Sequence, residues 1–167
     1  MNEYYNLTTT QMGMWKTEQF YRGTAIANIG GTFILKEDSD IELWEKAINK
    51  FIENNESIRL RINLQDGIPF QYISEYEYKT IETINFASSA REEMDKWLSD
   101  KMRIPFDLYH SDLFEFLIIK TFDEKYGLYF KCHHLICTKQ KKVHFYCLEL
   151  AQRKYGNIVQ NIIYLQQ

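Results

Sequence analysis

Residues 112–137 read DLFEFLIIKTFDEKYGLYFKCHHLIC and contain two apolar runs, 113–122 and 126–134. A polar triplet, Asp123-Glu124-Lys125, separates the two runs. Runs of this length that are rich in Phe, Ile, Leu and Tyr and are bounded by polar turn residues are typical of β-strands. The stretch therefore predicts a β-hairpin at the centre of a sheet.

Side chains alternate between the two faces of a sheet along each strand, and the second run has a clear alternation. One parity consists of Tyr126, Leu128, Phe130 and Cys132. His134 shares this parity, so we expect it on the face that carries the apolar side chains, whereas His133 points the other way with Tyr129 and Lys131. An imidazole at His134 is then either a core histidine with a hydrogen-bonded nitrogen or a base directed into a cavity beyond the sheet. Spacing alone favours the core histidine, which is the commoner case.

Helical and strand-like segments surround this hairpin. Apolar residues recur at helical spacing over 8–20, over 40–54 and from residue 88 or 89 to 102, with candidate caps in Asp38-Ser39-Asp40 and in the Thr-rich start of the first segment. Strand-like runs lie at 28–35, 58–64, 69–73 and 80–85, and Gln65-Asp66-Gly67 joins two of them as a second hairpin. This order predicts an α/β domain, a mixed sheet with helices packed on it.

The composition is that of a folded domain. The chain has 167 residues, 45% of them hydrophobic, and only 7 Gly and 2 Pro, which excludes disorder over most of its length. No apolar stretch is long enough to cross a bilayer, and the first residues lack the basic and apolar regions of a signal peptide. We therefore expect a cytoplasmic protein with no membrane partner and with reduced thiols at its three cysteines.

The charge is distributed unevenly along the chain. Residues 138–167 contain five Lys or Arg and one Glu, whereas residues 1–137 contain 15 basic and 22 acidic residues. The last thirty residues thus differ in character from the rest. Five basic residues without clustered arginines are too weak a footprint for nucleic acid, so no nucleic-acid partner is expected.

Common nucleotide and hydrolase motifs do not occur. No G-x-x-x-x-G-K or G-x-G-x-x-G follows a predicted strand, and no G-x-S-x-G is present. Gly30-Gly31 lies inside a predicted strand, where close packing of backbones is the simpler explanation. The sequence therefore gives no support for a nucleotide cofactor or for a serine hydrolase.

Two segments in the first half of the chain match short motifs. LTTTQMGMW at 7–15 fits S-x-A-Q-x-R-[LM]-W, with Gln11, Met14 and Trp15 in place. NNESIR at 54–59 fits R-H-E-x-L-R, with Glu56 and Arg59 in place. Read by themselves, Gln11 and Trp15 belong to a helical core stripe, and Glu56 and Arg59 are expected to form a structural ion pair or cap.

Two further segments follow in the same order. IPFDL at 104–108 contains P-F-D-L, in which Asp107 is expected to organise a turn, and KCHHLIC at 131–137 fits the first half of H-H-x-x-x-D-G. With all four motifs in register, residues 4–137 resemble the N-terminal lobe of the condensation domains of nonribosomal peptide synthetases. The resemblance supersedes the spacing argument for His134, because the second histidine of the last motif is the catalytic one in that family.

The resemblance implies a chloramphenicol-acetyltransferase-like fold in which two lobes form a V around a tunnel. Carrier proteins deliver acyl and aminoacyl thioesters on phosphopantetheine, and the family joins them through an amide bond without a metal or nucleotide. His134, with its neighbour His133, is then the candidate for positioning or deprotonating the attacking amine. Gln11, Trp15, Glu56, Arg59 and Asp107 are carried over as structural residues of the motifs.

Thr138 and Lys139 stand where the last motif has Asp and Gly. The family Asp is thought to pair with an arginine and to hold the histidine loop, and leaving a buried arginine unpaired costs about 3–5 kcal/mol. Nothing after Cys137 resembles the family. We expect residues 138–167 to be a divergent basic tail, such as a frameshifted gene end would produce, and the chain alone to be inactive.

Two other functions remain as alternatives. All three cysteines lie between 132 and 147, and a zinc site can be imagined from Cys132, Cys137, His144 and Cys147, although these spacings match no common zinc motif. The other alternative is a noncatalytic interaction module that exposes an apolar face and self-associates or complements a second lobe.

Overall fold

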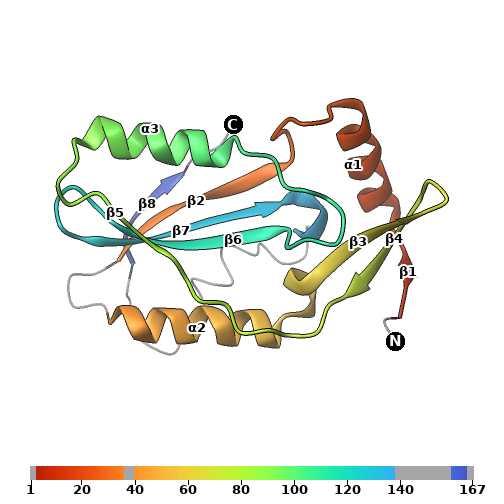
Figure 1. Cartoon of the computed structure of the whole chain (residues 1–167), viewed down its shortest axis with the longest axis horizontal. Coiled ribbons are helices and arrows are strands. Elements are labelled where there is room, and N and C mark those ends of the chain that lie inside the picture. Colours follow the sequence, from red (N-terminus) through yellow and green to blue (C-terminus); the bar gives the residue numbers. More distant parts are fainter. Residues whose placement is uncertain (1–2, 36–39, 138–158, 165–167) are drawn as a thin grey trace.

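The computed structural model describes residues 3–35, 40–137 and 159–164 (Figure 1). A five-stranded sheet has the order β5-β6-β7-β2-β8. Its strands are β2 (Asn28–Leu35), β5 (Thr83–Asn85), β6 (Phe114–Lys120), β7 (Tyr126–His133) and β8 (Val159–Tyr164). Only β5 and β6 run parallel, and the other neighbours are antiparallel, so the expected mixed sheet is confirmed.

The predicted central hairpin is formed by β6 and β7, which pair from Phe114↔Cys132 to Lys120↔Tyr126. Residues of one parity pack on one face of the sheet, where Phe116 and Phe130 have ring centroids 4.8 Å apart. Leu117 and Tyr129, of the other parity, belong to a second core on the opposite face. Both faces of the hairpin are therefore buried, which explains why its sequence is apolar almost throughout.

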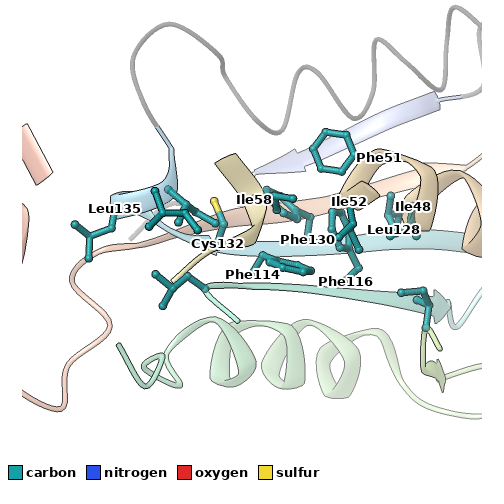
Figure 2. Close-up of a cluster of buried hydrophobic side chains, with 14 of the residues drawn as sticks. Ile48, Phe51, Ile52, Ile58, Phe114, Phe116, Leu128, Phe130, Cys132 and Leu135 are labelled. Carbon is teal, nitrogen blue, oxygen red and sulfur yellow. The ribbon is translucent and has the colours of Figure 1, made fainter. Parts of the chain in front are cut away.

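A helix covers each face of the sheet (Figure 1). On one face α2 (Ile41–Asn54), capped by the Asp40 carboxylate, packs its Trp44, Ile48, Phe51 and Ile52 into the larger core. Figure 2 shows Ile48, Phe51 and Ile52 of this helix in the same cluster as Phe116, Leu128 and Phe130 of the hairpin. On the other face α3 (Arg91–Met102) contributes Met94, Leu98 and Met102.

A second, three-stranded sheet lies beside the first and has the order β1-β4-β3, with β1 at Tyr5–Asn6, β3 at Leu60–Gln65 and β4 at Ile68–Ile73. Asp66 and Gly67 connect β3 to β4 with φ angles of 51° and 78°. Positive φ at both positions is the requirement of a type I′ turn, which Asp-Gly satisfies well. The predicted second hairpin is confirmed. The helix α1 (Thr9–Phe20) follows β1 and has a capping box formed by Thr8 and Gln11.

Several predicted boundaries are wrong by a few residues. The expected strand at 58–64 begins only at Leu60, because a 3-10 turn, η1 (Glu56–Arg59), precedes it. The strand expected at 80–85 pairs only over β5, and α3 begins after Ala90 instead of at residue 88 or 89. These differences lie at element ends, where local sequence signals are weakest.

The sequence predicts that the lobe ends at Cys137, but the five-stranded sheet includes a strand from beyond that residue. Residues 159–164 form β8, which pairs antiparallel with β2 from Gly31↔Tyr164 to Leu35↔Val159. Residues 138–158 lie outside the described part of the chain. The interpretation of 138–167 as a divergent tail thus stays a prediction, but six of its residues extend the sheet.

The backbones of β2 and β7 lie close together at Gly30. This glycine lies opposite Lys131, and a Cβ added to it would meet the Phe130 carbonyl oxygen, while Lys131 Cα and Met102 Cε would both be 2.9 Å away. Two of these three obstacles are backbone atoms that cannot rotate away. Close packing, not ligand binding, accounts for this glycine.

We predict that Gly30→Ala lowers the free energy of unfolding by about 1–3 kcal/mol, because β2 must move away from β7 to admit the methyl group. Gly13→Ala is the matched control. Gly13 is exposed within α1 and its added Cβ would meet nothing within 4 Å, so this change should raise stability by about 0.5–1 kcal/mol. Urea denaturation measures the free energy of unfolding of both variants. An equal change in the two variants would contradict the prediction.

Candidate functional site

The two candidate histidines lie where β7 ends. His133 is the last residue of β7, and His134 begins a 3-10 turn, η2 (His134–Ile136). The His133 N–H donates to the Leu113 carbonyl and the His134 N–H donates to the Ala27 carbonyl, each at 2.8 Å. The chain therefore leaves the ladder between the two histidines, so strand alternation does not extend to His134.

His133 is buried, with 2% of its surface exposed, and both of its ring nitrogens have partners. The Leu135 N–H donates to Nδ1 at 3.1 Å, and Nε2 lies 3.2 Å from Oε1 of Glu18. Because Nδ1 accepts a hydrogen bond, the proton of the neutral ring is on Nε2, which donates to Glu18. This histidine is the satisfied core histidine that spacing alone favoured for its neighbour.

Burial sets the charge state of this pair. Desolvation lowers the pKa of His133 to about 4, and the neighbouring His134 adds to the effect. Desolvation also raises the pKa of the Glu18 carboxyl, although a hydrogen bond from the Ala27 backbone partly offsets it. His133 is therefore neutral near pH 7 and is not available as a proton acceptor, since Nδ1 is already occupied.

Glu18 is a residue of the site that the sequence interpretation did not single out. It lies on α1, seven residues after Gln11, and is 8% exposed. A carboxylate on the apolar stripe of a helix was the available signal, because a buried charge requires a partner. The partner, His133, is 115 residues away in the sequence and only the fold brings the two together.

Gln11 and Trp15 connect α1 to the same region. The Gln11 side chain is buried, and its Nε2 donates to Oε1 of Gln71 at 2.8 Å and to the Leu135 carbonyl at 3.4 Å. The Trp15 indole N–H donates to the Tyr109 hydroxyl at 3.2 Å. Through Gln11 and Glu18, α1 thus holds both the η2 turn and the ring of His133.

His134 differs from His133 in exposure and in partners. It is only partly buried, and its imidazole has no hydrogen-bond partner among the residues that the structure describes. Its backbone is nevertheless fixed, because its N–H bonds to Ala27 and its carbonyl accepts the Cys137 N–H at 3.2 Å. The fold therefore presents an accessible imidazole on a rigid turn, which is the arrangement that a general base needs.

The side chain of Lys131 is a buried polar group on the same face of the sheet as His133. Lys131 is 3% exposed, and its Nζ lies 3.2 Å from Oε2 of Glu115 and 4.6 Å from the centroid of the Phe106 ring. It also donates to the carbonyls of Lys101, in the last turn of α3, and of Ile104, which follows α3. Lys131 shares this face with His133, as the alternation predicted.

The side chains of Asp107 and Arg59 form hydrogen bonds to backbone groups, and none of these groups belongs to His133 or His134. The Asp107 carboxylate accepts a hydrogen bond from the Tyr109 N–H at 3.1 Å, and the Asp107 backbone carbonyl accepts one from the Ser111 hydroxyl. The Arg59 guanidinium donates to the Ser74 carbonyl at 2.8 Å and more weakly to that of Glu53. Of the two expected roles, an ion pair or a cap, the described residues show no Glu56–Arg59 ion pair, whereas the bond from Arg59 to the Glu53 carbonyl in the last turn of α2 is a capping contact.

Of the four imagined zinc ligands, the described part of the chain contains Cys132 and Cys137, whose sulfurs lie 2.6 Å apart. His144 and Cys147 lie outside it. Within residues 3–35, 40–137 and 159–164 no three His, Cys, Asp or Glu side chains gather as metal ligands would. None of the helices described is both long and apolar enough to span a bilayer.

Comparison with known proteins agrees with this architecture. Residues 1–137 match the family model described as Condensation domain. Since the match covers most of the chain, the chain belongs to the condensation-domain family. Its fold is therefore chloramphenicol-acetyltransferase-like, as the motifs predicted.

Relatives of the chain are peptide synthetases of bacilli. It is 35% identical over 138 residues to surfactin synthase subunit 1 of Bacillus subtilis (strain 168), a match that covers 80% of this chain and 4% of that protein. It is 29% identical over 134 residues to bacitracin synthase 3 of Bacillus licheniformis, covering 80% and 2%. The chain thus spans a small part of the length of these relatives.

Solved structures show the same fold. The starter condensation domain of rhizomide synthetase RzmA superposes with a TM-score of 0.76 at 20% identity, covering 90% of this chain and 37% of that one. The first condensation domain of the calcium-dependent antibiotic synthetase has a TM-score of 0.68 at 16% identity, covering 79% and 33%. The chain therefore spans about a third of a solved condensation domain.

We predict that the stability difference between the wild type and His133→Asn shrinks as the pH falls from about 7 to about 4.5. The folded-state pKa of His133 lies below its unfolded value of 6.5, so the unfolded chain binds the proton first and the wild type loses stability through this window. Asn can still accept the Leu135 N–H but has no such titration. The difference should shrink by roughly 1–3 kcal/mol.

Denaturant unfolding at several pH values measures this difference. His110→Asn is the matched control, because the same change is made at an exposed position. A difference between wild type and His133→Asn that stays constant or widens on acidification would show that His133 is not held neutral by the fold.

Proposed function

We propose that residues 1–137 act as the N-terminal lobe of a condensation domain that joins carrier-bound thioesters by amide bond formation, with His134 as its catalytic residue. The observation that carries the proposal is the contrast between the two histidines. His133 is buried, neutral and occupied at both ring nitrogens, whereas His134 is partly exposed on a turn whose backbone is fixed. Only His134 is in a state to exchange a proton with a substrate.

The chemistry follows from an imidazole placed beside an amine. The acceptor amine attacks the thioester carbonyl of the donor, the C–N bond forms, and the carbon–sulfur bond breaks with release of the carrier thiol. The His134 ring accepts a proton from the amine as it attacks, or orients the amine by hydrogen bonding. His133 acts as a positioning residue, because its bond to the Leu135 N–H fixes the turn on which His134 lies.

The partners proposed are peptidyl or acyl carrier proteins that deliver their substrates on phosphopantetheine. The relatives named above are peptide synthetases, and one rhizomide synthetase structure is described as a complex with C8-CoA, an acyl thioester. This chain binds no cofactor of its own in the proposal. The donor and acceptor groups come from the partner carriers.

A second lobe is required to complete the tunnel in this proposal. The chain spans about a third of solved condensation domains, and Thr138 and Lys139 replace the Asp and Gly of the histidine motif. We therefore propose that the 167-residue chain has no condensation activity by itself, and that its lobe is competent when a second lobe and the motif's Asp and Gly are supplied.

A chimera tests this proposal. Residues 1–137 replace the segment of surfactin synthase subunit 1 that matches them, so that the host supplies the motif's Asp and Gly and the second lobe. Amide product from loaded donor and acceptor carriers is measured by mass spectrometry. We predict product from the chimera, a roughly 100-fold or larger loss with His134→Ala, and none from the 167-residue chain.

The matched control is His110→Ala in the same chimera, since His110 is an exposed histidine far along the sequence from the motif. It should leave the rate unchanged. Full activity of the folded His134→Ala chimera would overturn the assignment of the catalytic residue, and turnover by the isolated chain that His134→Ala abolishes would overturn the need for a second lobe.

An interaction module is the second candidate function, and exposed apolar side chains favour it. Phe20 is 81% exposed, and Ile26 and Ile104 are each 53% exposed. The segments that carry Ile26 and Ile104 are tied together, because the Asn28 amide donates to the carbonyls of Met102 and Ile104 at 2.8 Å. Exposed apolar side chains on these two connected segments and on Phe20 are suited to contact another polypeptide.

Size-exclusion chromatography with light scattering at several protein concentrations tests this second candidate. We predict concentration-dependent association that Phe20→Ser and Ile104→Ser weaken, because each removes exposed apolar area. Leu64→Ser, at another exposed position in the β3–β4 hairpin, is the control. A monomer at all concentrations would exclude self-association.

A further inference from the structure

Cys132 and Cys137 bracket the histidine turn. Cys132 is the penultimate residue of β7 and is fully buried, whereas Cys137 directly follows η2 and is partly exposed. Figure 2 shows Cys132 within the larger core, at the same end of the sheet as Leu135. The two sulfur atoms are 2.6 Å apart.

This separation is the consequence of the turn geometry. The 3-10 turn reverses the chain after β7, and the Cys137 N–H returns to the His134 carbonyl at 3.2 Å. The strand end is held by the bonds of His133 to Leu113 and of His134 to Ala27. Both ends of the six-residue segment are therefore fixed by backbone contacts, so that the sulfurs meet without further movement of the strand.

We propose that Cys132 and Cys137 form a redox-active dithiol that closes to a disulfide on reaction with a hydroperoxide, locking the turn that carries His133 and His134. A disulfide bond is about 2.05 Å long, so the sulfurs need to approach by only about half an ångström. The proposal concerns a modification site and holds whether or not the chain takes part in condensation.

The reaction is balanced with hydrogen peroxide as the oxidant. The Cys137 thiolate attacks one peroxide oxygen, the O–O bond breaks, and water leaves after protonation, which gives a sulfenic acid at Cys137. The Cys132 sulfur then attacks the Cys137 sulfur, the S–O bond breaks, and a second water leaves. Two thiols and one peroxide thus become one disulfide and two waters.

The order of the two steps follows from accessibility. Cys137 is partly exposed and is the thiol that solvent-borne peroxide reaches. Cys132 has no exposed surface, so it acts as the resolving thiol from inside the core. A resolving thiol already at this distance captures the sulfenic acid before further oxidation to sulfinic acid.

Peptide mapping distinguishes this disulfide from the alternatives. Trypsin places Cys132 and Cys137 together in the peptide 132–139, and Cys147 in the separate peptide 143–153. The full chain is reduced, freed of reductant, treated with hydrogen peroxide and alkylated. We expect the peptide 132–139 to be about 2 Da lighter and unalkylated in most of the chain, with 143–153 alkylated and the change reversed by dithiothreitol.

Variants separate the roles of the three cysteines. Cys147→Ser should keep the 2 Da shift, and Cys137→Ser should lose it entirely. In Cys132→Ala the peroxide should leave a sulfenic acid at Cys137 that dimedone traps. Circular dichroism of Cys137→Ser, in which the altered residue is partly exposed, shows whether loss of the shift is accompanied by loss of the fold.

Oxidation of the same chain in guanidinium chloride is the reference for random pairing. The proposal requires the 132–137 disulfide to be enriched in the folded chain over this reference. Cross-linking of 132–139 to 143–153, sulfinic acid at Cys137 beside an alkylated Cys132, or the same pairing pattern in the folded and unfolded chain would each overturn it.

Discussion

Burial of both faces of the β6–β7 hairpin is the constraint on which the rest of the structure depends. A strand pair with Phe116 and Phe130 on one face and Leu117 and Tyr129 on the other must be covered twice. Since full burial of each large apolar side chain is worth about 1.5–3 kcal/mol, the covering helices are strongly favoured. The helices α2 and α3 supply the two covers, and β2 fits against β7 only because Gly30 lacks a side chain.

The position of the histidine turn, η2, follows from where the β6–β7 hairpin ends. The ladder stops at His133, and α1 then supplies both a partner for that ring, Glu18, and a donor to the Leu135 carbonyl, the Gln11 side chain. A buried neutral imidazole and a buried carboxyl oxygen satisfy each other at modest cost, because neither is left without a hydrogen bond. The fold thereby holds one histidine rigidly and leaves the adjacent one partly exposed.

Much of the fold was predictable from local patterns. The helix ending at Asn54, the Asp66-Gly67 hairpin and the central hairpin appear in the sequence as periodicity and turn residues, and all are present in the structure. The element ends were less predictable, because a 3-10 turn before β3 and the short β5 depend on tertiary contacts. Arg59 forms no ion pair with Glu56 for the same reason, since it bonds instead to the carbonyls of Ser74, just after β4, and Glu53, in α2, and sequence spacing cannot reveal these partners.

The sequence by itself determined the class of fold, through the two apolar runs of the central hairpin and four motifs in a fixed order, and the last of these motifs singled out the two histidines as candidates. The tertiary structure alone decided that His133 is buried and neutral, because burial lowers its pKa and its hydrogen-bond partner Glu18 lies 115 residues away in the sequence. It also decided that Cys132 and Cys137 meet, since that depends on where the strand stops and the 3-10 turn begins. Local sequence carries periodicity, whereas burial and long-range pairing arise only when separate elements pack together.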